Sequence, residues 1–352
     1  MMFNGAKTMM NFCTLFDSYY LDKGIALYRS LVRVTEDFTL YIFCFDDKSF
    51  EILNEMNFEH VVVLHHSCFE TPEYLEVKKI RSKAEYCWTC TSVIIEYVLK
   101  NYNVDSCTYL DSDLYFYADP QILFDEIHRA DADVTIVEHR FKNNAYGRKL
   151  EERNGKYCVE FNYFKQTPNA MRVLTWWKEK CYEWCYDIPE FDRMGDQKYL
   201  NTWTRDFEGI HELQNLGGGV APWNLEQYTF DNINDYDITM KTNDGKSFSL
   251  IFYHFQNIRY MPGRKVNIKS QTRNKKLKYA IYVPYLKEIE EIRKKLETEY
   301  EVDFNPNKLA RSSNPVMAYL QKHFAALKVK YMSDVMNLDN LDKYLKKENN
   351  EC

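Results

Sequence analysis

Apolar runs alternate with amphipathic segments along the first part of the chain. Residues 11–15 form a short apolar run that predicts a strand, and from about Leu21 the apolar positions recur with the period of a helix. Further apolar runs at 38–47 and 61–64 predict buried strands, and a long helical pattern follows over 79–102. Strands that alternate with helices predict a parallel sheet with crossover helices, so the expected fold class is α/β.

The pattern is less regular in the second part of the chain. Apolar runs at 133–139 and 157–164 predict two more strands, and the polar segment 140–155 between them predicts a flexible loop. A last apolar run, 249–257, predicts a strand that carries His254. These elements extend the sheet beyond its first strands.

After this last strand the composition changes. The chain turns basic with RKVNIKSQTRNKKLK and then helical, with charge runs such as LKEIEEIRKKLETEY that are typical of solvated helix faces. We therefore predict a catalytic domain over residues 1–262 and a basic, helical C-terminal extension over 263–352.

Composition narrows the class of protein. The 352 residues carry 46 basic and 52 acidic side chains, a net charge of −6, which argues against a nucleic-acid partner bound on a broad basic face. The 28 Tyr and 22 Phe residues make the chain rich in aromatics, as sugar-handling proteins often are. The ten cysteines are scattered, and CWTC lies within a helical pattern, so we expect reduced, packed thiols in a cytoplasmic protein.

Two carboxylates, Asp111 and Asp113, stand one residue apart in CTYLDSDLYFYADP, directly after an apolar run. Asp is poor in strand interiors, so the pair marks the exit of a strand. Side chains two residues apart share a face of an extended chain, and the two carboxylates can therefore share one divalent cation. Such a cation keeps positions open for phosphate oxygens, which suits a diphosphate ligand.

Other interpretations of the pair stay open. Asp-x-Asp also marks turns and helix caps. An aspartyl phosphatase has its motif early in the chain with a Thr soon after, whereas Leu114 and Tyr115 follow here. Ligands of parallel sheets bind beyond the carboxyl ends of the strands, and Asp17, Asp46 and Asp47 also follow predicted strands at that edge.

The order of these motifs resembles the retaining glycosyltransferases of family 8 and their bacterial relatives with the GT-A fold, over roughly residues 10–260. Those enzymes begin with a strand, an Asp-containing turn, a Tyr and a helix, and LFDSYYLDKGIALYRSL is similar to that segment. The resemblance implies that Asp17, with Tyr19 or Tyr20, holds the nucleobase and ribose of a nucleotide sugar.

The resemblance also implies a metal site. YLDSD matches the family's Asp-x-Asp, so Asp111 and Asp113 would bind manganese or magnesium that bridges the diphosphate, with His254 in IFYHFQN as the third ligand. A lone His at a strand end is more often structural, and only the order of the motifs favours the metal. Arg259, Arg264 and Lys265, which follow His254, are candidates for phosphate contact.

A second matching pair is Asp196 and Gln197 in GDQKYLN. In the family this pair lies under the transferred sugar, with Asp at the hydroxyls and Gln near the anomeric carbon. A helix N-cap at Asp196 would also explain the motif. The family's Asn and Gly nearby are replaced by Cys158 and Glu160 in YCVEFNY, so the sugar pocket is expected to differ.

Two more departures concern phosphate contacts. The family's Arg in the helix before the metal motif falls near Trp88, so its role would pass to Arg81 or Lys83. The Gly and Lys that follow the metal-binding His in the family are missing, with Asn257 and Arg259 nearby instead. The identity of the donor therefore cannot be copied from the resemblance.

The resemblance implies a metal-dependent hexosyltransferase. It would move a sugar from a nucleotide-diphosphate sugar, with UDP as the expected carrier, to a glycan or glycolipid in surface polysaccharide or lipopolysaccharide synthesis. Retention is expected with a phosphate oxygen as base, whereas inversion would need a carboxylate base, for which Glu160 and Asp196 are candidates. KHFAALKVKYM near the C-terminus suggests a weak contact with the inner face of the membrane.

Two alternatives of other kinds stay open. A non-catalytic scaffold on the same fold would explain the changed residues Cys158, Glu160 and Trp88. A nucleotide-sugar pyrophosphorylase would share the fold and the metal, but it needs a Gly-rich, Arg-containing loop after the first strand, which LFDSYYLDKG lacks.

Overall fold

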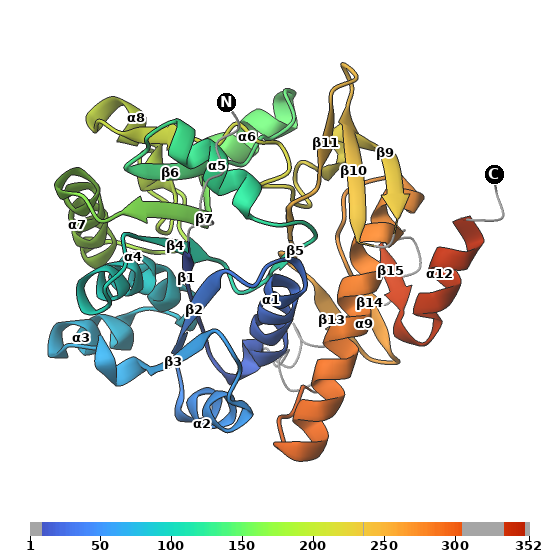
Figure 1. Cartoon of the computed structure of the whole chain (residues 1–352), viewed down its shortest axis with the longest axis horizontal. Helices are drawn as coiled ribbons and strands as arrows, with labels where there is room; N and C mark the ends of the chain where they lie inside the picture. Colours follow the sequence, from blue (N-terminus) through green and yellow to red (C-terminus); the bar gives the residue numbers. More distant parts are fainter. Residues whose placement is uncertain (1–8, 235, 305–333, 349–352) are drawn as a thin grey trace, which may run out of the picture. The chain divides into compact units, whose positions relative to one another are not determined.

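The computed structural model describes residues 9–234, 236–304 and 334–348 (Figure 1). The chain forms two compact units, one made of the residues up to Val220 with Phe248–His254, the other of Ala221–Ser247 with Phe255–Cys352. The segment KHFAALKVKYM lies outside the described residues. The predicted functional boundary at residue 262 stays a prediction.

The first unit is built on a seven-stranded mixed sheet, which confirms the predicted α/β fold class (Figure 1). Its strand order is β3-β2-β1-β4-β7-β6-β8, and β7 runs antiparallel to both of its neighbours while the other pairs are parallel. The strands are β1 (Met10–Phe16), β2 (Phe38–Cys44), β3 (Val61–His65), β4 (Ser106–Leu110), β6 (Val134–Glu138), β7 (Tyr157–Lys165) and β8 (Ile210–Glu212).

Helices cover this sheet because its strands are apolar on both faces. Alternate side chains of β1 show this: Cys13 belongs to the cluster of buried residues that α4 and α7 complete, while Phe12 packs edge-on against Phe124 of α5, with ring centroids 5.9 Å apart. The helices of this unit are α1 (Leu21–Val34), α2 (Asp47–Met56), α3 (Pro72–Ile80), α4 (Lys83–Asn101), α5 (Gln121–Arg129), α6 (Ala145–Asn154), α7 (Pro168–Glu183) and α8 (Trp203–Asp206).

Two predicted segments differ from the structure. The single helix expected over 79–102 is broken, because Ser82 and Glu85 form a capping box that starts α4 anew. The loop expected over 140–155 contains α6, whose first turn is capped by Asn144. Hydrophobic periodicity did not predict α6 because Gly147 is its only fully buried position.

A short antiparallel pair fixes the position of the last strand in this unit. β5 (Leu114–Phe116) follows β4 almost directly and pairs with β12 (Phe252–His254). The register sets His254 opposite Leu114. The imidazole of His254, which is distant from the Asp-x-Asp turn in the sequence, thus lies beside that turn.

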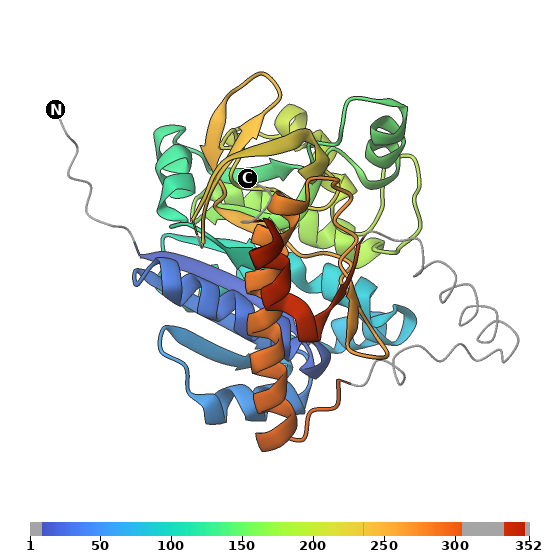
Figure 2. The same ribbon diagram turned by 90° about the vertical axis from the view of Figure 1, so that its right-hand side faces the viewer.

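The second unit combines small sheets with a long helix. One sheet has the order β11-β10-β9 and the other β13-β14-β15. α9 (Lys275–Glu299) packs against α12 (Leu341–Glu348), as Figure 2 shows. The strands are β9 (Tyr228–Asn234), β10 (Asp237–Thr242), β11 (Ser247–Ser249), β13 (Arg259–Met261), β14 (Lys265–Asn267) and β15 (Val335–Asn337).

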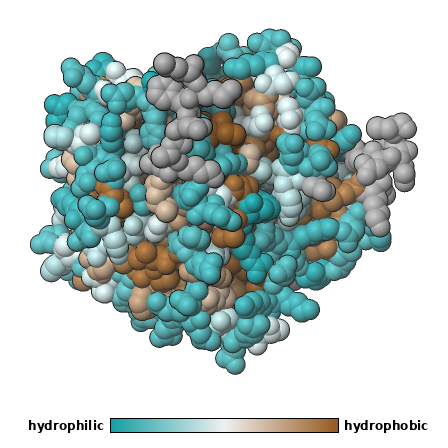
Figure 3. All heavy atoms as spheres, in the orientation of Figure 1, coloured by the Kyte–Doolittle hydropathy of each residue, from teal (hydrophilic) through white to brown (hydrophobic). Residues whose placement is uncertain are grey.

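None of the helices in the described ranges has the length and apolar composition needed to cross a bilayer. On the face seen in Figure 3, hydrophilic residues predominate and hydrophobic ones form separate patches.

Candidate metal and nucleotide site

The Asp-x-Asp turn and His254 form one cluster. Asp111 and Asp113 lie in the tight turn between β4 and β5, and β12 brings His254 to it. The His254 Nε2 atom is 3.1 Å from Asp113 Oδ1 and 3.5 Å from Asp111 Oδ2. One ligand atom from each residue lies within 4.8 Å of the others, a spacing that can hold a metal ion.

Glu160 supports His254 from the other side of the ring. Its carboxylate Oε2 is 2.6 Å from His254 Nδ1, and both side chains are buried. The Glu160 carboxylate can accept the Nδ1 proton, so that the Nε2 lone pair of the imidazole would face a cation bound by the two aspartates. The other oxygen, Oε1, has no hydrogen-bond partner in the described part of the chain.

Asp111, Asp113 and His254 shift one another's pKa values. Burial raises the pKa of Asp111 to about 7, and the charge of Asp113 adds to the effect. Burial also disfavours the charged form of Asp113, but the charge of His254 and its hydrogen bond outweigh this and lower the pKa of Asp113 to about 2. Burial alone would lower the pKa of His254, yet Asp113 and the hydrogen bonds to Cys158 and Glu160 raise it well above its ordinary value.

The residues present fit a divalent cation. Three carboxyl groups surround one imidazole in a largely buried place, so the cluster gathers more negative than positive charge. Two carboxylates and one imidazole form a donor set that suits manganese, and a carboxylate behind the imidazole is the usual support of a metal-binding His. Asp111, Asp113 and His254 would be the ligands.

The Asp196 and Gln197 pair lies in a turn before a 3-10 helix, η3 (Lys198–Thr202), instead of opening an α-helix. Gly195 makes this turn with a φ of +54°, and a Cβ there would lie 3.3 Å from the Trp88 ring. Trp88 therefore forms the surface against which this turn packs.

Asp196 is buried near the metal cluster. Burial raises the pKa of Asp196 to about 8, with the charge of Asp111 as the next cause, while a hydrogen bond with Thr91 acts against it. The side-chain Nε2 of Gln197 donates to the carbonyl oxygen of Asn154 at 2.9 Å, which ties the pair to the end of α6. The structure thus brings Asp196 into the field of Asp111.

The turn after β1 gathers the predicted nucleoside residues. Asp17 caps the short 3-10 helix η1 (Ser18–Tyr20), and Lys83 Nζ lies 3.1 Å from Asp17 Oδ2. Lys83 also lies over the Tyr19 ring, 5.0 Å from its centroid. Tyr19 and Tyr20 are 51% and 43% exposed, so their rings are available to a ligand.

Two further residues are affected by the charges of this region. Burial raises the pKa of Cys87 to about 12, and the charges of Asp17 and Asp111 both add to the shift. Lys23 is a basic group that acts on Asp113 and was not predicted from the sequence. The signal in the sequence that could have identified Lys23 is its position just after the turn that contains Asp17.

Other predicted residues lie elsewhere. Arg81 is buried and donates to the carbonyl oxygens of Cys181 and Tyr182, each at 2.7 Å, so it ties the start of α4 to the end of α7. Arg259 belongs to β13 in the second unit, and Arg264 pairs with Glu290. Their phosphate roles stay predictions.

The glycine-rich loop at 216–219 packs against the chain itself. A Cβ at Gly217 would lie 2.0 Å from the carbonyl oxygen of Ser249, and one at Gly219 would lie 2.6 Å from Val137 Cγ1. Arg140, which sequence patterns did not single out, donates to the carbonyl oxygen of Gly218 at 2.6 Å. Gly217 and Gly219 therefore allow this loop to pack closely against the chain.

Several solved structures of glycosyltransferases are similar to the chain. An active-site mutant of the galactosyltransferase LgtC is 12% identical, with a TM-score of 0.46 over 71% of this chain and 88% of that one. Mouse xyloside xylosyltransferase 1 is also 12% identical, with a TM-score of 0.44 over 70% of this chain and 98% of that one. The α/β class of the chain follows from its sheet topology.

Sequence comparison identifies the family. No protein-family model matches the chain. The uncharacterized protein YfnF of Bacillus subtilis is 30% identical over 253 residues, which cover 70% of this chain and 81% of YfnF. The chain belongs to the family of YfnF.

Glu160 offers a test of the site's geometry. We expect Glu160→Leu to weaken Mn²⁺ binding by about 10- to 100-fold, because His254 loses the acceptor that orients it. Glu160→Gln keeps an oxygen acceptor for Nδ1 and should retain most of the affinity. Titration of Mn²⁺ followed by electron paramagnetic resonance measures both, with circular dichroism as the check on folding. Equal affinities in the wild type and Glu160→Leu would contradict the role given to Glu160.

Proposed function

We propose that the chain is a metal-dependent glycosyltransferase that takes a hexosyl group from a nucleotide-diphosphate sugar, with UDP as carrier, to a glycan or lipid-linked acceptor of a surface glycan. The observation that carries this proposal is the cluster of Asp111, Asp113 and His254, with Glu160 behind the imidazole. A cation bound there would neutralise charge on the diphosphate as it leaves.

The other residues of the proposed site fall into two groups, one for the nucleoside of the donor and one for its sugar. Asp17, Tyr19 and Tyr20 hold the nucleoside, because they share one turn and the two rings are exposed. Lys83, paired with Asp17, supplies positive charge beside that turn. The turn with Asp196 lies in the field of Asp111, which supports a role for this pair at the sugar.

The geometry around Glu160 argues against Glu160 as the base that inversion would need. A base for inversion must reach the acceptor hydroxyl, but Glu160 is fully buried and its carboxylate accepts a hydrogen bond from His254. Glu160 therefore serves as a positioning residue in this proposal. The acceptor proton would pass to a phosphate oxygen of the donor on the face that the diphosphate leaves.

Removal of one carboxylate tests the metal-dependent activity. We expect Asp113→Asn to lower turnover by about 100-fold or more, because a cation ligand is lost where the leaving group develops charge. The assay is hydrolysis across a panel of nucleotide sugars with Mn²⁺ and with EDTA, and Asp125→Asn on the exposed side of α5 is the matched control. Turnover by the wild type that is unaffected by EDTA would contradict the proposal.

Gln197 tests the assignment of the sugar subsite. We expect Gln197→Ala to lower turnover while the affinity for the nucleoside diphosphate stays within about twofold, because an interaction with the reacting sugar does not contribute to binding of the product nucleotide. Steady-state kinetics and calorimetric titration with the diphosphate measure the two quantities, and Gln214→Ala is the control. Equal losses in both would show that Gln197 only stabilises the turn.

A further inference from the structure

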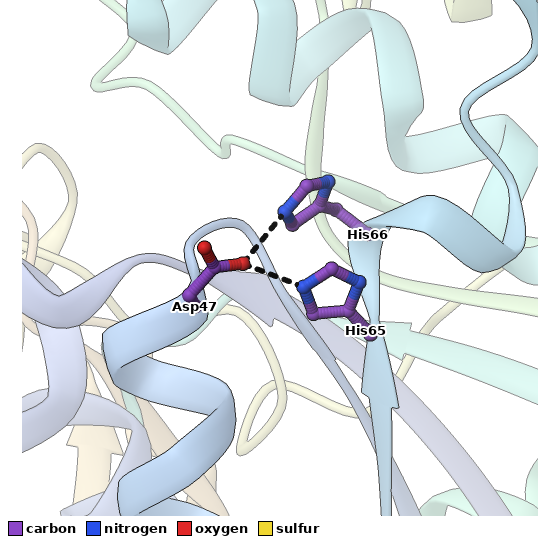
Figure 4. A group of neighbouring side chains, drawn as sticks. All are labelled: Asp47, His65 and His66. Atoms are coloured by element: carbon purple, nitrogen blue, oxygen red, sulfur yellow. Dashed lines mark hydrogen bonds and ion pairs between the residues drawn. The ribbon is translucent and has the colours of Figure 1, made fainter.

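A second cluster of metal-binding side chains lies outside the residues used above. Asp47 is the first residue of α2, His65 is the last of β3, and His66 begins the short 3-10 helix η2 (His66–Cys68). Figure 4 shows both imidazole rings turned toward the Asp47 carboxylate. Asp47 Oδ1 is 2.8 Å from His65 Nε2 and 3.5 Å from His66 Nε2, and the three ligand atoms lie within 4.8 Å of one another.

The ring of His66 is held by a buried carboxylate. His66 Nδ1 lies 2.7 Å from Glu70 Oε2, and the Glu70 side chain is only 4% exposed. The other carboxylate oxygen, Oε1, accepts from Lys78 Nζ at 2.6 Å and from the Tyr86 hydroxyl at 2.8 Å. Glu70 is thereby fixed, and the Nε2 atom of His66 is directed at Asp47.

The ring of His65 has an outer partner as well. Its Nδ1 atom accepts a hydrogen bond from Ser67 N at 3.3 Å and lies 2.8 Å from the Ser67 hydroxyl. When Nε2 binds a cation, Nδ1 would carry the proton and donate it to that hydroxyl oxygen. An ordinary surface ion pair needs only one imidazole beside the carboxylate. Here the Nε2 atoms of both imidazoles face one oxygen of Asp47, and the Nδ1 atom of each ring lies beside a polar side chain. Metal-binding histidines are arranged in this way.

We propose that Asp47, His65 and His66 form a second divalent-metal site, which takes zinc or a similar transition-metal ion. Two imidazoles and one carboxylate are ligands that suit zinc, and three protein ligands leave a tetrahedral ion one position for water. The Asp47 side chain is 80% exposed, so ions enter from solvent.

The site would tie two loops of the first unit together. The neighbouring Asp46 caps α2 through Ser49 N at 2.8 Å and holds the Ser18 hydroxyl at 2.7 Å. An ion on Asp47 would fix the start of α2 to the end of β3, next to the carboxylate that supports the turn after β1. Zinc should therefore raise the melting temperature of the protein as well as bind to it.

Zinc titration of the untagged, full-length chain tests the proposal. Competition with a chromophoric chelator gives the number of ions bound and their affinities. We expect the wild type to bind one more equivalent of Zn²⁺ than either Asp47→Asn or His66→Ala. The control is His128→Ala, which removes an exposed His outside this cluster and should behave as the wild type. Glu70→Leu should weaken this equivalent by about 10- to 100-fold, because His66 loses the acceptor that orients its ring.

Substitution of Co²⁺ adds a readout of the ligands, since its visible absorption should lose intensity in His66→Ala. Asp47→Asn changes a mostly exposed side chain, so it keeps the test valid if His66→Ala fails to fold by circular dichroism. Zinc stoichiometry and affinities that are the same in wild type, Asp47→Asn and every folded His66 variant would overturn the proposal.

Discussion

The central interaction of the first unit is the contact of one imidazole, that of His254, with three carboxyl groups. Asp111 and Asp113 leave the sheet at the end of β4, and Glu160 is fully buried in β7, its antiparallel neighbour. Like charges in a place of low dielectric repel strongly, and burial of each charged group costs further free energy. His254, brought in by the pairing of β12 with β5, lies between them and compensates part of that charge.

This constraint explains how the surrounding residues are used. Glu160 orients the imidazole, and the backbone of Gly219 passes so close that a Cβ there would lie 3.2 Å from Glu160 Oε1. Trp88 supports the turn of Gly195 that precedes Asp196. Glu160 and Trp88 are thus part of the packing around the Asp-x-Asp turn and the turn of Asp196.

The sequence predicted those parts of the fold and the site that depend on local pattern. The apolar strands and the helix from Leu21 were predicted by hydrophobic periodicity, and the Asp-x-Asp pair by its position at a strand exit. The polar helix α6 and the break before α4 were not, because capping residues rather than apolar spacing determine them.

Interactions between distant parts of the sequence could not be predicted in this way. The contact of His254 with Glu160 depends on the register of β12 against β5. Arg81, a candidate for phosphate contact along with Lys83, is buried and donates to carbonyl oxygens at the end of α7, which local pattern did not indicate. Asp47, His65 and His66 come together only because α2 begins beside the end of β3.

The most direct measurement is the anomalous diffraction of crystals grown with Mn²⁺ and a nucleoside diphosphate, recorded at the manganese edge. The account predicts a peak within coordination distance of Asp111, Asp113 and His254 Nε2, with diphosphate oxygens on the same ion. A manganese ion bound without His254, or a nucleotide bound away from the Asp-x-Asp turn, would contradict it.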